Sequence, residues 1–110
     1  MANPRLATGI WVSAYLKRLG LQNIPAYVIA HGDNTAGAVL VKCALLDGTD
    51  QLWTREWDFE TDSHDWRMSL QADEASVDAA IRRQRGFDPD LWVIEIESRE
   101  GSVLLEEEGF

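Results

Sequence analysis

The residues whose types could bind a metal ion lie between Asp58 and Asp65. Carboxylates alternate along Asp58-Phe-Glu60-Thr-Asp62-Ser-His64-Asp65, and an imidazole accompanies them. Oxygen ligands of this kind suit a divalent cation, so the segment is a candidate site for a metal or a small ligand. The spacing departs from a calcium-binding loop, because Ser63 stands where that loop needs glycine and Ser69 where it needs the bidentate glutamate. A solvated acidic loop is the interpretation that we favour.

Other residue types that serve in catalysis occur outside any recognisable motif. Cys43 is the single cysteine, and His31 and His64 are the two histidines. Asp88 and Asp90 flank Pro89, where short acidic side chains commonly bind local backbone in a turn. The chain has no phosphate-binding loop, dinucleotide glycine pattern, His-Glu-x-x-His sequence or nucleophile elbow. An uncharacterised enzyme therefore stays an open alternative, but the sequence predicts no catalytic residue and no cofactor.

The composition of the chain indicates which classes of macromolecule the protein can bind. The chain has 110 residues, 45% of them hydrophobic and five of them Trp, which predicts a single domain with a substantial core. Its net charge of −9 argues against nucleic acid and against anionic membrane surfaces. The first residues contain no apolar signal core, and no apolar run approaches the roughly 18 residues of a membrane span. We therefore expect a cytoplasmic protein whose partner is another protein or a second copy.

The first half of the sequence predicts one helix followed by three strands. Ile10, Trp11, Ala14, Tyr15 and Leu19 give the segment from Thr8 to Leu19 one apolar flank, with Thr8 as a candidate cap and Gly20 after it. Extended segments follow at Pro25 to His31, Ala38 to Leu46 and Gln51 to Phe59. The Asp47-Gly48 pair favours a two-residue hairpin turn between the last two. These strands are expected to form an antiparallel meander.

The second half predicts another helix and the last strands. Val77, Ala80, Ile81 and Gln84 recur at helical spacing within Asp73 to Arg85, Gly86 is a candidate terminator, and Pro89 prevents resumption. From Leu91 the polarity alternates, as in a strand, and Val103 to Leu105 is a candidate edge strand. The segment Trp66 to Leu70 is ambiguous. The expected fold is α+β, in the order α-β-β-β-α-β-β, with two helices packed on one face of an antiparallel sheet of four or five strands.

Strand pairing then predicts a surface. A two-residue turn at Asp47-Gly48 sets Lys42 opposite Trp53, and the preceding turn sets Tyr27 opposite Lys42. One face of the sheet would then be aromatic and basic, while Val39, Val41 and Cys43 face the core. A slip of one residue would reverse this assignment, because side chains alternate between faces. Five residues are candidates for partner binding on this face: Tyr27, Lys42, Trp53, Arg55 and Trp57.

Aromatic and Arg side chains anchor many protein interfaces. The hypothesis is therefore a non-catalytic interaction module that binds a protein partner or associates with itself through the aromatic and basic face. The competing interpretation is that a helix or the C-terminal strands cover these residues, leaving only the long cationic side chains to reach solvent.

Three stretches of the chain also resemble a known family. They are Arg-Leu-Ala-Thr-Gly-Ile-Trp-Val from Arg5, Gly37-Ala-Val-Leu-Val-Lys42, and Arg85-Gly-Phe-Asp-Pro-Asp-Leu-Trp-Val-Ile-Glu-Ile-Glu97. In these stretches the chain resembles DUF1491, an alphaproteobacterial family of small proteins of unknown function. The resemblance implies a bacterial single-domain protein of about this length. It implies no activity, cofactor or catalytic residue.

Overall fold

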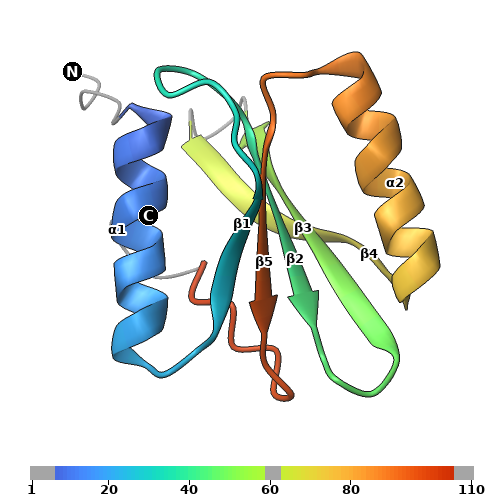
Figure 1. Cartoon of the computed structure of the whole chain (residues 1–110). Helices are drawn as coiled ribbons and strands as arrows, with labels where there is room; N and C mark the ends of the chain where they lie inside the picture. Colours follow the sequence, from blue (N-terminus) through green and yellow to red (C-terminus); the bar gives the residue numbers. More distant parts are fainter. Residues whose placement is uncertain (1–6, 59–62, 106–110) are drawn as a thin grey trace.

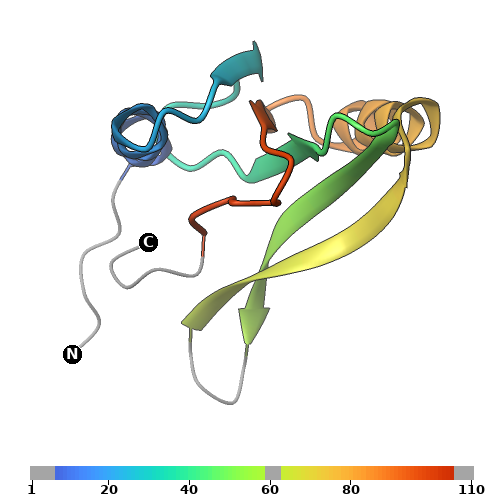
Figure 2. The same ribbon diagram turned by 90° about the horizontal axis from the view of Figure 1, so that it is seen from below.

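The computed structural model describes residues 7–58 and 63–105, with side chains described outside 56–64. It shows an α+β fold in which two helices lie on opposite sides of one mixed sheet (Figures 1 and 2). The strands of this sheet are arranged in the order β1-β5-β2-β3-β4. In chain order the elements are α1 (Thr8–Leu21), β1 (Ala26–Ala30), β2 (Val39–Ala44), β3 (Thr49–Asp58), β4 (Ser63–Asp73), α2 (Glu74–Phe87) and β5 (Trp92–Glu97).

The α+β class with two helices and a sheet of five strands is confirmed, and the chain begins with a helix and three strands as expected, but a fourth strand, β4, lies before α2. The ambiguous segment at Trp66 to Leu70 belongs to β4, which pairs with β3 as a long antiparallel hairpin. The candidate edge strand at Val103 to Leu105 is not a strand. Instead Val103 and Leu105 are buried as an irregular segment, and the Tyr15 hydroxyl donates to the Val103 carbonyl at 2.7 Å.

The sheet is mixed because β5 lies between β1 and β2. It pairs antiparallel with β1 and parallel with β2, so the expected antiparallel meander of β1 and β2 does not form. Trp92, Val93, Ile94 and Ile96 are all buried, and a nearly continuous apolar run is typical of a strand covered on both faces. Burial on both faces agrees with the place of β5 inside the sheet rather than at its edge.

Each helix buries its own face of the sheet, which corrects the expectation that both helices share one face. Val41 and Ile94 pack with Tyr15 and Leu19 of α1, whereas Leu40 and Val93 pack with Val77 and Ile81 of α2. Neighbouring residues of β2 and of β5 therefore point to different helices, as strand alternation requires. The irregular C-terminal segment joins the cluster on the α1 side (Figure 2).

The helix ends follow local chemistry with two corrections. Asp73 caps α2, since its carboxylate accepts from the Ser76 amide at 3.2 Å. Gly86 does not terminate α2, which continues to Phe87 before Pro89. Thr8 does not cap α1 either. Its hydroxyl donates to the Gly37 carbonyl at 2.8 Å and joins the start of α1 to the loop before β2.

The β2–β3 connection is one residue longer than expected. The Leu45 amide donates to the Thr49 carbonyl at 3.1 Å, and Ala44 pairs with Asp50, so Leu46, Asp47 and Gly48 form a three-residue loop. Leu46 and Gly48 both have positive φ, at 64° and 91°. As a result Lys42 faces Leu52, and Val41 faces Trp53. This slip of one residue changes which side chains share a face.

Candidate functional site

The five residues predicted to bind a partner do not form one face. Tyr27 and Lys42 lie on the α2 side of the sheet, while Trp53 packs partly against the cluster on the α1 side. Arg55 is exposed on β3, and the side chain of Trp57 lies outside the described part of the chain. Val39 and Val41 are buried, as expected. The cause of the split is the three-residue loop before β3, which moves Trp53 to the opposite side from Lys42.

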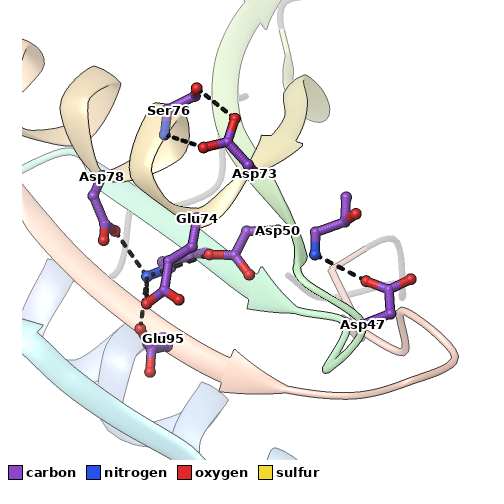
Figure 3. Close-up of polar contacts among 9 residues, drawn as sticks. Asp47, Asp50, Asp73, Glu74, Ser76, Asp78 and Glu95 are labelled. Carbon is purple, nitrogen blue, oxygen red and sulfur yellow. Dashed lines mark hydrogen bonds and ion pairs between the residues drawn. The ribbon is translucent and has the colours of Figure 1, made fainter.

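Lys42 instead lies at the centre of a group of carboxylates that we call the Lys42 cluster. Although Lys42 is only 5% exposed, its Nζ lies 2.8 Å from Asp78 Oδ1 and 3.1 Å from Glu95 Oε1. Asp50 and Glu74 follow at 3.4 and 3.7 Å. Figure 3 shows the four carboxylates converging from β3, β5 and α2. The cluster therefore connects the helix to three strands of the sheet.

Burial and charge act in opposite directions on Lys42. Burial by itself lowers the pKa of Lys42, but the hydrogen bonds from Nζ to Asp78 and Glu95 outweigh it and hold the pKa above its ordinary value. A lysine that stays protonated serves neither as a nucleophile nor as a general base. Among the described residues, no group of carboxylates, imidazoles or thiols is arranged to hold a metal ion. We interpret the cluster as the contact that fixes α2 on the sheet.

Asp50 is the member of the Lys42 cluster whose buried carboxylate opposes folding. Its side chain is buried, and Oδ2 has no hydrogen bond; the 3.4 Å contact with Lys42 Nζ is an ion pair without hydrogen-bond geometry. Burial raises the pKa of Asp50 despite the opposing charge of Lys42. A carboxyl group whose pKa rises on folding favours the folded state only where it is protonated, so its ionised form opposes folding at neutral pH.

We therefore expect Asp50→Asn to raise the free energy of unfolding at pH 7. The gain should shrink as the pH falls through the unfolded aspartate pKa of about 3.9, because below that pH wild-type Asp50 is protonated in both states. Urea denaturation followed by Trp fluorescence at several pH values measures it. Asp47→Asn is the matched control, since Asp47 is exposed and accepts from the nearby Thr49 amide. A loss of stability at pH 7 in Asp50→Asn alone would contradict the assignment.

The remaining sequence candidates do not assemble into a site. Cys43 is fully buried, and burial raises the pKa of its thiol to about 11, so the thiol is protonated at neutral pH. His31 is exposed, and its ring lies 3.9 Å from that of Trp92. Asp88 accepts from the Asp90 amide, which is the local turn contact expected from the sequence. The metal candidate between Asp58 and Asp65 includes residues 59–62, which lie outside the described residues.

The surface that sequence reasoning largely missed is the free edge of β1. Tyr27, Val28 and Ile29 are 49%, 41% and 58% exposed on a strand that pairs, among the described residues, with β5 alone. The sequence did assign Tyr27 to a binding surface, but to a sheet face shared with Lys42 and Trp53 rather than to a strand edge. The missed signal is the run from Ile24 to Ala30, which contains no charged residue in a chain of net charge −9. An uncharged edge strand readily pairs with a further strand, because its outward-facing N–H and C=O groups are not used within its own sheet.

The opposite edge of the sheet has the features that prevent pairing. Strand β4 exposes Asp65 and Arg67, and a bulge at Ser69 interrupts its pairing with β3. Charged side chains and bulges are the usual means by which edge strands avoid association. The two edges of this sheet therefore differ in character, and β1 is the edge suited to a partner.

Comparison with known proteins gives a family and no activity. A family model described as "Protein of unknown function (DUF1491)" matches residues 6–106. The fold resembles the crystal structure of a DUF1491 family protein from Caulobacter crescentus CB15, with a TM-score of 0.85, 37% identity, and 94% of this chain and 97% of that chain covered.

Two solution structures are similar as well. The NMR structure of a DUF1491 family protein from Caulobacter crescentus CB15 gives a TM-score of 0.81 at 36% identity, with 96% of each chain covered. A protein from A. tumefaciens gives 0.75 at 31% identity, with 93% of each chain covered. No curated protein matches the chain.

Proposed function

Because the chain belongs to DUF1491, a family of unknown function, we propose from the geometry that it is a non-catalytic interaction module that binds protein segments along β1. The observation that carries this proposal is the free, uncharged edge formed by Tyr27, Val28 and Ile29. An extended segment that pairs with such an edge gains main-chain hydrogen bonds. Its side chains can pack against the exposed Tyr27 ring and the aliphatic side chains of Val28 and Ile29.

The proposed role is the interaction module expected from the sequence. The proposed binding surface is the β1 edge instead of the aromatic and basic face. Tyr27 remains a candidate contact residue, and its aromatic ring suits an interface anchor. Lys42 is only 5% exposed and belongs to the Lys42 cluster, so it is not available to a partner. In the described part of the chain, no helix is long and apolar enough to cross a membrane.

The test compares two substitutions that place a charge on each edge of the sheet. Val28→Lys puts a cation on the β1 edge, and Met68→Lys does the same on β4, where Met68 is comparably exposed at 44%. We expect wild-type and Met68→Lys baits to retain the same protein from an alphaproteobacterial extract, and Val28→Lys to lose it. The retained protein, once purified, should bind wild type in calorimetry. Equal binding by both variants would overturn the proposal.

A further inference from the structure

A cavity of about 380 Å³ lies at the end of the sheet where β2 and β5 end and β1 begins. Three segments of the chain form its walls and meet at this end (Figure 1): the turn between α1 and β1, the loop between β2 and β3, and the irregular segment after β5. The volume is within the range of small-molecule sites. No residue of the Lys42 cluster and none of the exposed residues of β1 lines it. The cavity is therefore a separate candidate site.

The backbone around the cavity adopts strained conformations. Asn23, Leu46 and Leu104 have positive φ, at 59°, 64° and 55°. Among the described residues other than glycine, these three alone have positive φ, and each comes from a different wall of the cavity. A positive φ brings Cβ too close to the backbone and is rare for a residue as bulky as leucine. Backbone strain gathers at ligand-binding sites, so its convergence on one cavity favours a binding role.

Side chains of opposite charge line the cavity without pairing. Glu97 is half-buried and Arg99 is exposed, and in the described structure neither side chain forms an ion pair or a hydrogen bond. The carboxylate of Glu100, also in the wall, accepts from the Ser98 hydroxyl at 3.5 Å. A ligand with a single charge would be attracted by one of Glu97 and Arg99 and repelled by the other. A ligand that carries both an anionic and a cationic group gains an attraction at each.

The remaining wall indicates what else the ligand contains. Ile24, Pro25, Leu46 and Leu104 give the cavity an apolar side. Leu46 is 49% exposed, so a hydrocarbon group placed beside it would remove apolar surface from water. An ammonium, a carboxylate and a hydrocarbon group within one small molecule are the three parts of an aliphatic α-amino acid.

We propose that this cavity binds a free α-amino acid with an aliphatic side chain. The Arg99 guanidinium donates to the ligand carboxylate, for which its planar fork is suited, and the Glu97 carboxylate accepts from the ligand ammonium. The aliphatic side chain packs against Leu46 and Leu104. Such a ligand has no net charge, so the net charge of −9 does not repel it. This binding goes beyond the function proposed above and does not depend on β1.

Calorimetry with matched ligands tests the need for both charges. L-leucine has the whole set of groups, isoamylamine lacks its carboxylate, and isocaproate lacks its ammonium. We expect L-leucine to bind with a dissociation constant on the order of 1 mM or lower, and each analogue to bind about tenfold more weakly, because each loses a charge-assisted hydrogen bond. Binding of either analogue as tightly as L-leucine overturns the proposal. So does the absence of binding by L-leucine, L-isoleucine and L-valine at about 10 mM.

Two substitutions assign the charges to their residues. Arg99→Gln should bind L-leucine about as weakly as the wild-type protein binds isoamylamine, because each change removes the same contact. Glu97→Gln should bind L-leucine about as weakly as the wild-type protein binds isocaproate. Arg83→Gln is the matched control, since Arg83 is an exposed arginine of α2 outside the cavity, and it should bind L-leucine as the wild type does. Unchanged binding of L-leucine in Arg99→Gln and Glu97→Gln overturns the proposal.

Amide chemical shifts locate the bound ligand. Saturation with L-leucine should move the NMR resonances of Asn23, Leu46 and Arg99, one from each wall, and leave those of α2 in place. Changes confined to another surface overturn the proposal. Val28→Lys should bind L-leucine as the wild type does, because Val28 does not line the cavity. Failure of the β1 edge to retain a protein and failure of the cavity to bind an amino acid are therefore separate results.

Discussion

Replacement of Lys42 by Met should lower the free energy of unfolding by about 3–5 kcal/mol, because removing one partner of a buried ion pair leaves the other uncompensated. The substitution leaves Asp50 buried without a cation and removes the nearest partner of Asp78 and Glu95. The contact between α2 and the sheet should loosen first. Urea denaturation followed by Trp fluorescence, together with hydrogen exchange along α2, measures both effects.

The loss of unfolding free energy in Lys42→Met should depend on pH in a defined direction. Because the pKa of Lys42 is raised on folding, its contribution is fully present below the unfolded lysine pKa of about 10.4 and is lost only as the pH rises through the folded value. The difference between wild type and Lys42→Met should therefore persist at pH 7. It should shrink in acid, where the carboxylates become protonated.

Two further variants make the result specific to the Lys42 cluster. Lys17→Met removes an exposed lysine from α1 and should change stability by no more than about 0.5 kcal/mol. Adding Asp50→Asn to Lys42→Met should restore part of the loss, because it removes one of the uncompensated charges. A loss below about 1 kcal/mol in Lys42→Met would show that the cluster is not a buried charge network in solution.

Replacement of Gly32 by Ala should be the second large effect. A Cβ atom at this position would lie 2.1 Å from the Asp90 carbonyl oxygen and 2.6 Å from the Trp92 ring. The obstructing atom is backbone, so the loop itself must move. Overpacking of this kind costs about 1–3 kcal/mol and sometimes more. The movement should also disturb the 3.0 Å bond from the Asp33 amide to the Asp90 carbonyl.

Gly20→Ala is the matched control for this substitution. Gly20 lies within α1, and a Cβ atom there would meet nothing within 4 Å. Alanine is a better helix former than glycine, so this variant should gain about 0.5–1 kcal/mol. Thermal unfolding compares the pair, and the amide resonance of Asp33 reports the local change in Gly32→Ala. Wild-type stability in Gly32→Ala would show that the close approach of Gly32 to Asp90 is relaxed in solution.

The close packing at Gly32 and Gly37 also explains what the three stretches of the family resemblance do together. The Thr8 hydroxyl binds the Gly37 carbonyl, and the Trp92 amide binds the Ala38 carbonyl at 2.9 Å. A Cβ atom on Gly37 would lie 2.5 Å from the Asp90 carbonyl oxygen. The stretches therefore meet where the start of α1, the loop before β2 and the turn before β5 pack against one another. Their shared role in the described structure is to hold this junction.

The amino-acid sequence by itself determined the elements whose causes are local. Apolar residues at helical spacing specify α1 and α2, Asp73 and Pro89 delimit α2, and the apolar residues from Trp92 to Ile96 specify β5 as a strand. The burial of Val39, Val41 and Cys43 was also predictable, because these three residues of β2 are apolar at every second position. Each of these features depends on residues within a few positions of one another in the chain.

Only the tertiary structure decided how these elements combine. The insertion of β5 between β1 and β2 depends on contacts between residues far apart in the chain, and local alternation does not encode strand order. The single additional residue in the loop before β3 places Trp53 on the opposite face of the sheet from Lys42, so the expected aromatic and basic face does not form. The same pairing left β1 at an edge and brought Lys42 among four carboxylates. Side chains alternate with a period of two, so a slip of one residue inverts a face although every local prediction is correct.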